Sequence, residues 1–167
     1  MNPSALDNLK RPNSLGLTGR LIADQLLTAD EAAESQKQSA LRDMPLVQYL
    51  VEIVGVDSRQ LAHSLASEFG APLIDLSAYN SDYLPKDLVD LKLLQKHRAL
   101  PLFKRGKRLF IALADPTRIE ALDEIKFHTG ITTEVIVADH VLLSSAIERF
   151  ADAKTSIEQL GELNHES

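Results

Sequence analysis

The spacing of apolar residues changes at Gly70, and this change constrains the fold more than any other feature. Between Leu15 and Phe69 apolar residues recur at helical intervals, which is typical of amphipathic helices. After Gly70, short apolar runs alternate with helical stretches and turn residues, which indicates strands mixed with helices. We therefore expect an α+β protein with a helical subdomain over 15–70 and a small α/β subdomain over 71–150.

The helical subdomain is expected to hold about four helices arranged as two helix hairpins. Thr28 and Glu31 form a capping-box pattern, Pro45 starts a third helix, and Asp57 or Ser58 caps a fourth. The spacing predicts an inward face in each of the last three helices: Ala32, Ala33 and Ala40 in the second; Leu46, Tyr49, Leu50 and Ile53 in the third; Leu61, Leu65 and Phe69 in the fourth.

The α/β subdomain is expected to contain a mixed sheet of three or four strands. "PLIDLS" and "TTEVIVA" indicate single strands, and "RALPLFKRGKRLFIALAD" indicates a hairpin that turns at Arg105-Gly106, with Pro101 on an edge strand. "YLPKDLVDLKLLQKH" predicts one or two short helices with Pro85 at the first helical position. A closing helix, "DHVLLSSAIERF", has Asp139 as its cap. The helix "TRIEALDEIKFHTG" has these candidates for its buried side: Ile119, Leu122, Ile125 and Phe127.

Both ends of the chain are polar. Residues 1–14, which include Pro3 and Pro12, are expected to form a flexible arm, and residues 151–167 a flexible tail or linker.

The helical subdomain also contains a possible internal repeat. The stretches that begin at Gly16 and Pro45 superpose with a constant offset, and each reads as helix, turn, cap and helix. The matching pairs are Leu17/Leu46, Leu21/Leu50, Ile22/Val51, Leu27/Val56 and Thr28/Asp57. The alternative is that two helical hairpins share apolar spacing by chance.

Composition excludes several classes of function. The net charge of -6 makes nucleic acid a poor partner, and the absence of cysteine rules out disulfides, a cysteine nucleophile and thiolate zinc sites. No apolar stretch is long enough to span a membrane, so we expect no direct membrane insertion, and the absence of cysteine fits the cytoplasmic location that we expect.

Motifs for catalysis are missing or weak. There is no Walker A or G-x-G-x-x-G pattern, and the histidines lack metal-ligand spacing: His63, His97, His128, His140 and His165. His63 is expected at the surface or its boundary. We therefore predict no catalytic, cofactor-binding or metal site.

Two polar features have structural explanations. Asp115-Pro116 is expected to end a strand, with Asp115 or Thr117 accepting free N–H groups of the next helix, while Asp123 and Glu124 face solvent. The basic run "KRGKR" over 104–108 could grip an acidic partner, but its place at a hairpin tip favours a solvated turn.

The stretch "LLQKHRALPLFKRGKRLFIALADPTRIEALDEIKFHTGITTEVIVADHVLLSSAIERF" resembles the N-terminal module of the secretion and type IV pilus assembly ATPases. Within that family, "KLLQKHRALPLFKRG" and "DEIKFHTG" resemble the pilus extension ATPase. The resemblance implies a non-catalytic regulatory module, recruited to the inner-membrane pilus machine and its platform. ATP and Mg²⁺ would bind an ATPase core that lies outside this sequence.

In related modules, two copies of a motif separated by a short spacer bind cyclic di-GMP, and the offset from Gly16 to Pro45 fits the length of one motif plus its spacer. The polar ligands do not fit. In the two copies the arginine position holds Gly16 and Pro45, the glycine positions hold Thr18, Val47, Gln25 and Val54, and the final glutamine position holds Ser39 and Glu68. Losing two charge-assisted contacts of about 1.5–3 kcal/mol each would weaken binding a hundredfold or more. Arg20 and Arg42 could replace the missing arginines, so direct cyclic di-GMP binding stays the alternative.

The same resemblance implies a PilZ-type adaptor protein as the partner, and through it, indirectly, a cyclic di-GMP receptor. The expected docking surface is apolar and consists of Leu15, Leu17, Leu21, Ile22 and Leu26, with Leu27 beside it. The alternative is that these side chains form the core of the helical subdomain, which is favoured for Leu27.

Overall fold

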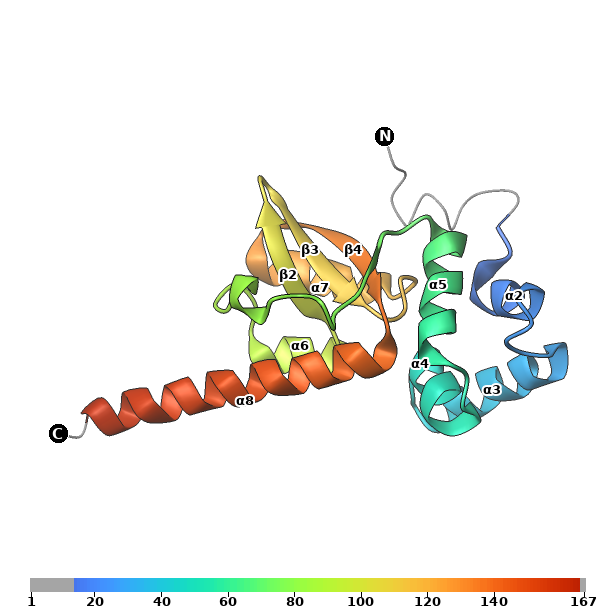
Figure 1. Cartoon of the computed structure of the whole chain (residues 1–167), viewed down its shortest axis with the longest axis horizontal. Coiled ribbons are helices and arrows are strands. Elements are labelled where there is room, and N and C mark those ends of the chain that lie inside the picture. The colour runs from blue at the N-terminus through green and yellow to red at the C-terminus, as the bar shows by residue number, and fades with distance from the viewer. Residues whose placement is uncertain (1–13, 166–167) are drawn as a thin grey trace.

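A computed structural model describes residues 14–165, and most of the predicted N-terminal arm lies outside this range. Figure 1 shows a helical half beside a sheet with its own helices, and one long helix that extends away from both. The predicted α+β class and the order of its two parts are confirmed.

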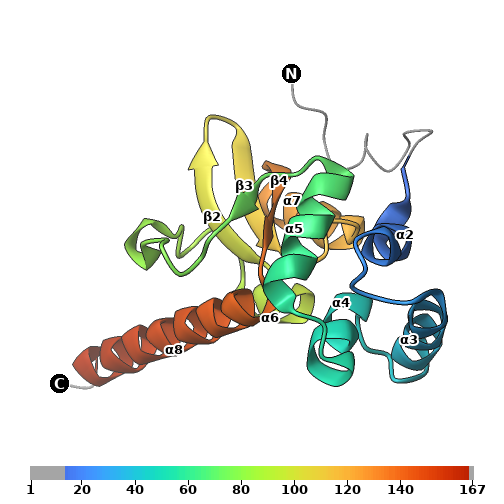
Figure 2. The ribbon, with the colours of Figure 1, turned by 45° about the vertical axis from the view of Figure 1, so that its right-hand side comes forward.

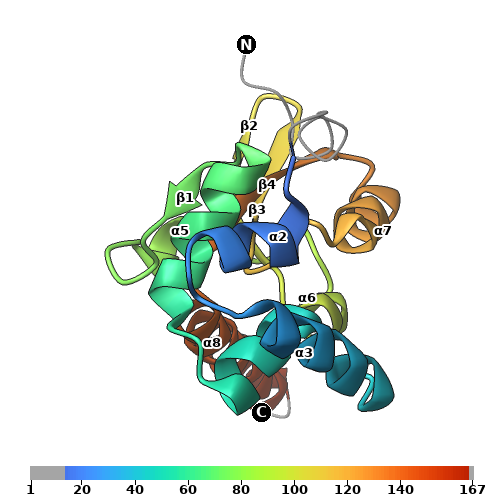
Figure 3. The ribbon, with the colours of Figure 1, turned by 90° about the vertical axis from the view of Figure 1, so that its right-hand side faces the viewer.

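The helical half consists of α2 (Gly16–Ala23), α3 (Ala29–Leu41), α4 (Leu46–Tyr49) with a π-helical turn η1 (Leu50–Val54), and α5 (Ser58–Phe69). In Figure 3 this half faces the viewer. Helices α3 and α5 begin directly after predicted caps, because the Thr28 and Asp57 side chains each accept a hydrogen bond from the backbone of the first helical turn.

The predicted inward face of α3 is largely wrong. Ala32 is buried, but Ala33 and Ala40 are exposed, and Ser35 and Ser39 are buried in their place. Ser39 satisfies its hydroxyl by donating to the Gln36 carbonyl at 3.1 Å. Small hydroxyl residues therefore line this contact, and an apolar pattern could not reveal it.

The predicted stripe of the third helix fails at Ile53, which is exposed, while Tyr49 and Leu50 are buried. The cause is η1, because its i→i+5 hydrogen bonds add a residue to the turn and rotate later side chains away from a 3.6-residue stripe. Gly55 ends this turn with φ +88°, in the left-handed region.

The sheet has the order β1-β4-β3-β2, with β1 (Leu73–Ile74), β2 (Leu100–Arg105), β3 (Arg108–Leu113) and β4 (Thr132–Ala138). The β2–β3 pair is antiparallel, whereas β3–β4 and β1–β4 are parallel, so the predicted mixed sheet is confirmed. The hairpin turns at Gly106, which has φ +60°.

Pro101 lies on β2, an edge strand as predicted, and an irregularity in the β2–β3 register follows it. An edge strand tolerates proline because its outward side needs no ladder hydrogen bond.

The connection between β1 and β2 contains a short 3₁₀ turn, η2 (Ser81–Tyr83), and α6 (Leu91–His97). The prediction that Pro85 occupies a first helical position is wrong, because α6 begins later. Its cap is Asp90, whose Oδ1 accepts a hydrogen bond from Lys92 N at 3.3 Å.

Helix α7 (Ile119–Thr129) buries Leu122 and Ile125 as predicted. Phe127, also predicted to face inward, is 85% exposed. Two helical positions from Ile125 correspond to a turn of about 200°, so Phe127 points to the opposite side of the helix.

Helix α8 runs from His140 to His165, and Asp139 caps it by accepting hydrogen bonds from Val141 N at 2.8 Å and Leu142 N at 3.3 Å. The cap is as predicted, but the helix does not end near residue 150. Figures 1 and 2 both show the second half of α8 extending past the sheet and α6.

Helix α5 joins the two halves. It packs against α2 on one side and against β1, β4 and α8 on the other, and Figure 2 shows it between them. Its buried residues Leu61, Leu65 and Phe69 belong to one hydrophobic cluster that continues into the sheet at Ile111 and Ile136.

Candidate functional site

The two repeats have the same capping geometry. Thr28 Oγ1 accepts from Glu31 N at 3.1 Å, and the Glu31 carboxylate accepts from Thr28 N, which completes the predicted capping box. At the equivalent place in the second copy, Asp57 Oδ1 accepts from Gln60 N at 2.9 Å.

The hydrogen bonds that close the turns inside the two repeats also match, although the left-handed residue is Gln25 in the first copy and Gly55 in the second. Leu26 N donates to Leu21 O at 2.9 Å, and Gly55 N donates to Leu50 O at 3.0 Å, so donor and acceptor occupy equivalent positions in the two copies. Leu21 and Leu50 are both fully buried. The caps, the hydrogen bonds that close the turns and the buried leucines thus agree between the copies, which supports a structural repeat over chance spacing.

A groove lies where the end of the first repeat and the start of the second face the Asp115-Pro116 turn. We call it the repeat groove. It encloses about 590 Å³ and is lined by Ser39, Ala40, Asp43, Met44, Pro45, Leu46, Lys96, His97, Asp115, Arg118 and Glu120. Two motif positions meet here, since Ser39 stands at the final glutamine of the first copy and Pro45 at the arginine of the second.

Val47 follows the groove residues Pro45 and Leu46 in the sequence but does not line the groove. It stands at a glycine position of the second copy, yet its side chain is only 2% exposed and belongs to the core. It also lines a small cavity of about 20 Å³ next to Asp115. The position that holds glycine in the motif therefore serves internal packing in this chain.

Asp115 is almost fully buried. Its Oδ1 accepts hydrogen bonds from Thr117 N at 2.9 Å and Thr117 Oγ1 at 2.6 Å, so the predicted polar turn is present, although the helix N–H groups are not its donors. Burial raises the pKa of this carboxyl, and the two bonds from Thr117 oppose that rise. The residue is thus held as part of the turn.

Glu124 is not simply solvent-facing, as the sequence predicted. Its Oε2 accepts a hydrogen bond from the buried His97 Nε2, and Lys96 Nζ lies 3.2 Å from its Oε1. These contacts, chiefly the one with His97, lower the pKa of Glu124. The two partners lie on α6, far from Glu124 in the sequence, so no local motif could have revealed them.

Neither substitute arginine lies in the repeat groove. Arg20 Nε donates to Asp24 Oδ2 at 2.8 Å, and Asp24 also accepts from Ser64 Oγ at 2.6 Å. The Arg42 guanidinium lies 5.5 Å from the centre of the Tyr49 ring. Both cations are therefore engaged with other groups of the chain.

The residues predicted to dock a partner divide into three groups by their exposure. Leu15 and Ile22 are exposed, and Leu17 and Leu26 are partly buried against the core. Leu21 is fully buried, so its inclusion in the docking surface is wrong, and Leu27 is a core residue too. Helical spacing alone does not separate the core side of α2 from its outer edge.

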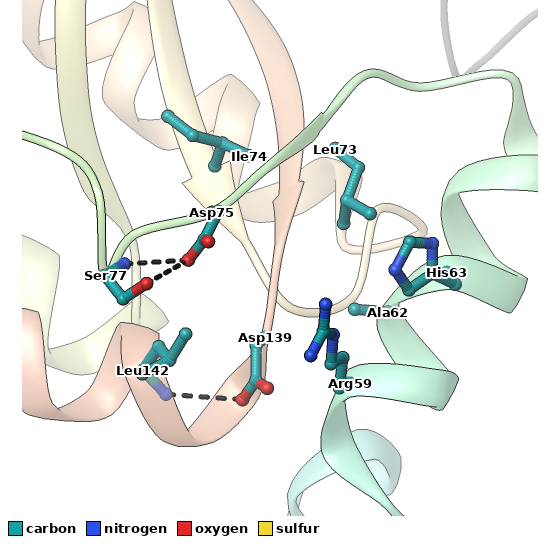
Figure 4. Close-up of a pocket in the computed structure, with 9 residues that line it drawn as sticks. All are labelled: Arg59, Ala62, His63, Leu73, Ile74, Asp75, Ser77, Asp139 and Leu142. Carbon is teal, nitrogen blue, oxygen red and sulfur yellow. Dashed lines mark hydrogen bonds between the residues drawn. The ribbon is translucent and has the colours of Figure 1, made fainter.

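A second cavity, of about 440 Å³, lies between α5, β1 and the start of α8. Figure 4 shows Arg59 and His63 on the α5 side and Asp75 and Asp139 on the other. Both carboxylates accept hydrogen bonds from their own turns, Asp75 from Ser77 N at 3.0 Å. His63 is exposed there, as predicted.

Among the residues whose side chains the structure describes (14–80 and 82–161), no cluster of three potential metal ligands is found, and none of the helices there combines the length and the apolar character of a membrane span.

Fold and repeat geometry together define a small α+β module with a helical repeat, and the family follows from its sequence. Residues 69–157 match the MshEN domain, so the chain belongs to the MshEN domain family.

The similar curated proteins are type IV pilus assembly ATPases named PilB. The chain is 33% identical over 140 residues to PilB of Pseudomonas aeruginosa, covering 84% of this chain and 25% of that protein. It is 32% identical over 129 residues to PilB of Acinetobacter baylyi, covering 77% and 22%. The chain thus spans about a quarter of the length of the relatives it matches.

Two solved structures share the fold. The N-terminal domain of XpsE aligns with a TM-score of 0.67 at 23% identity, covering 89% of this chain and 97% of that one. A structure of MshE with cdg aligns with a TM-score of 0.60 at 22% identity, covering 80% and 97%.

Proposed function

We propose that this chain is the regulatory protein-docking domain of a type IV pilus assembly ATPase, and that it binds a PilZ-type adaptor protein. Through the adaptor it would respond to a cyclic di-GMP receptor and control pilus extension and twitching motility. The domain itself is non-catalytic in this proposal. ATP hydrolysis belongs to the core of the full-length protein, which works in the cytoplasm at the inner-membrane pilus platform.

The observation that carries this proposal is that the repeat scaffold is kept, while residues at its motif positions make contacts within the chain. Val47 fills the core where the motif has glycine. Glu68 replaces the final glutamine, and its Oε1 accepts a hydrogen bond from Leu15 N at 3.0 Å. A carboxylate there would also repel a phosphate. The chain therefore keeps the repeat scaffold but has fewer groups that could bind a dinucleotide.

Exposed apolar side chains at the start of the scaffold support a protein partner. Leu15 and Ile22 lie at the two ends of α2, with Leu17 and Leu26 partly exposed between and beside them. Apolar side chains grouped on one small helix, rimmed by polar residues such as Arg20, are suited to an interface with another polypeptide.

Isothermal titration of the domain with the PilZ-type adaptor tests the proposal. We expect binding at micromolar concentrations, and a loss of at least about tenfold for Ile22→Glu, because a charge would be desolvated in the interface. Val141→Glu is the matched control, since Val141 is an exposed apolar residue on α8, away from α2. No binding by the unaltered domain, or equal losses for both variants, would reject the docking surface.

Direct binding of cyclic di-GMP is the second candidate. The retained repeat geometry and the similar fold of MshE, solved with cdg, favour it. Calorimetry of the domain with cyclic di-GMP separates the two candidates: tight binding without an adaptor would replace the docking proposal with this one.

A further inference from the structure

A polar contact joins the second repeat to the α/β half at Glu52. Glu52 lies in η1, and its Oε1 accepts a hydrogen bond at 3.2 Å from Nε2 of His140, the first residue of α8. Nη1 of Arg98, which directly follows α6, lies 4.0 Å from the same oxygen. Figures 1 and 2 both show α4, which leads into η1, beside the start of α8. One carboxylate of the helical half therefore faces two elements of the α/β half.

The carboxylate of Glu52 is also oriented by its own helix. Gln48 Nε2 donates to Glu52 Oε2 at 3.0 Å, which leaves Oε1 for the α/β half. Partial burial opposes the ionisation of Glu52, but the hydrogen bonds from Gln48 and His140 outweigh it, so the pKa of Glu52 is lowered. The His140 ring is buried, so withdrawing Glu52 would leave its N–H without this acceptor, which is unfavourable away from water.

The backbone at Arg98 has an unusual conformation for its residue type. Arg98 ends α6 in the left-handed region, with φ +48°, where glycine is common and a larger residue is strained. Its Nη1 also donates to Ser144 Oγ of α8 at 3.3 Å. The strained residue is thus the one whose side chain lies between η1, α6 and α8, and backbone strain of this kind is concentrated at functional positions.

The first repeat has no equivalent of Glu52. The matching position in the first copy is Ala23, whose side chain has no polar group. Glu52 also lies in the π-helical turn, and each residue of such a turn rotates less about the helix axis than in an α-helix. A change of η1 between the two helical types would therefore change the direction in which Glu52 points.

We propose that Glu52 is a latch that couples the conformation of η1 to the start of α8. While η1 keeps its π turn, Glu52 accepts from the buried His140 ring and faces the positive charge of Arg98. A change in η1 that withdraws the carboxylate removes both contacts and loosens the first turns of α8. A partner bound at the repeats would thereby act on the α/β half; this last step rests on the proposed function, whereas the coupling itself does not.

Hydrogen exchange of the backbone amides of residues 143–147, near the start of α8, tests this coupling without any partner present. Gly55→Ala strains the end of η1, because Gly55 has φ +88°, so we expect these amides to exchange about three- to tenfold faster. In a chain that carries Glu52→Ala, which gives the second copy the residue of the first, Gly55→Ala should add less than about twofold. Gly55→Asn replaces it if Gly55→Ala does not fold, since asparagine tolerates this conformation better.

Gly130→Ala is the matched control. Gly130 ends α7 with φ +70°, and at both glycines an added Cβ meets no atom within 4 Å, so the two changes introduce similar backbone strain. Gly130→Ala should leave the exchange of residues 143–147 unchanged. Equal acceleration by the two variants would mean that these amides exchange by global unfolding. An undiminished effect of Gly55→Ala in the Glu52→Ala chain would mean that another route carries it, and either result overturns the proposal.

Discussion

The replacement of Val47 by glycine offers a direct test of whether the ligand position of the second repeat has become core. Val47 is 2% exposed and Val54, at the second glycine position of the same copy, is 37% exposed. Val47→Gly and Val54→Gly make the same chemical change within one repeat, so they differ chiefly in how much buried surface is lost.

The magnitudes follow from burial. Removing a fully buried valine side chain costs about 1.5–3 kcal/mol, and glycine adds up to about 1 kcal/mol in either helical position. We expect Val47→Gly to lower the free energy of unfolding by about 3 kcal/mol and Val54→Gly by about 1 kcal/mol. For a chain of this size the difference corresponds to roughly 4–8 °C in Tm.

Urea and thermal unfolding, followed by circular dichroism, measure both variants. If the two variants lose the same free energy of unfolding, Val47 does not stabilise the core. Its burial then cannot explain the weak dinucleotide binding that we expect. Calorimetry of the Val47→Gly variant with cyclic di-GMP is a separate measurement. It shows whether glycine at this position is enough to allow binding.

Two further predictions concern the α/β half. Because the hydrogen bond with His97 holds the folded-state pKa of Glu124 below its unfolded value, its stabilisation is complete above pH of about 4.3 and is lost as pH falls through the folded-state pKa. Urea midpoints between pH 7 and pH 3 should therefore fall less steeply for Glu124→Gln, and equal slopes would contradict this. Phe127→Ala should change stability by less than about 0.5 kcal/mol, whereas Ile125→Ala should cost about 2–5 kcal/mol; comparable losses in thermal melts would show that Phe127 is packed.

Local signals in the sequence predicted most of the elements. The Thr28 capping box, the Asp57 and Asp139 caps and the Gly106 turn depend on groups within a few residues of one another, so their chemistry is visible in the sequence. The edge position of Pro101 follows from the missing N–H.

The failures came from contacts between distant segments and from departures in helical period. The π turn moved Ile53 to the surface, and the Glu124–His97 contact joins residues that no motif connects. The full length of α8 was not predicted because most residues after 150 are polar, which is typical of a frayed end, although Ile157 and Leu160 are apolar.

The candidate site was predicted only in part. The offset from Gly16 to Pro45 correctly related the two copies, but the groove depends on the Asp115 turn facing Pro45 from another part of the chain. Leu21 was misplaced because a short helix such as α2 shows too few turns for its spacing to tell buried from exposed sides.

Because α5 packs against both halves of the molecule, it affects how the molecule unfolds. Leu61, Leu65 and Phe69 serve the repeats and the sheet at once, so melting either half uncovers apolar surface on the other. The change in pattern at Gly70 is therefore a boundary in secondary structure and not in cooperativity. Cleaving the chain at Gly70 would leave two fragments, each without part of the hydrophobic core that it packs against.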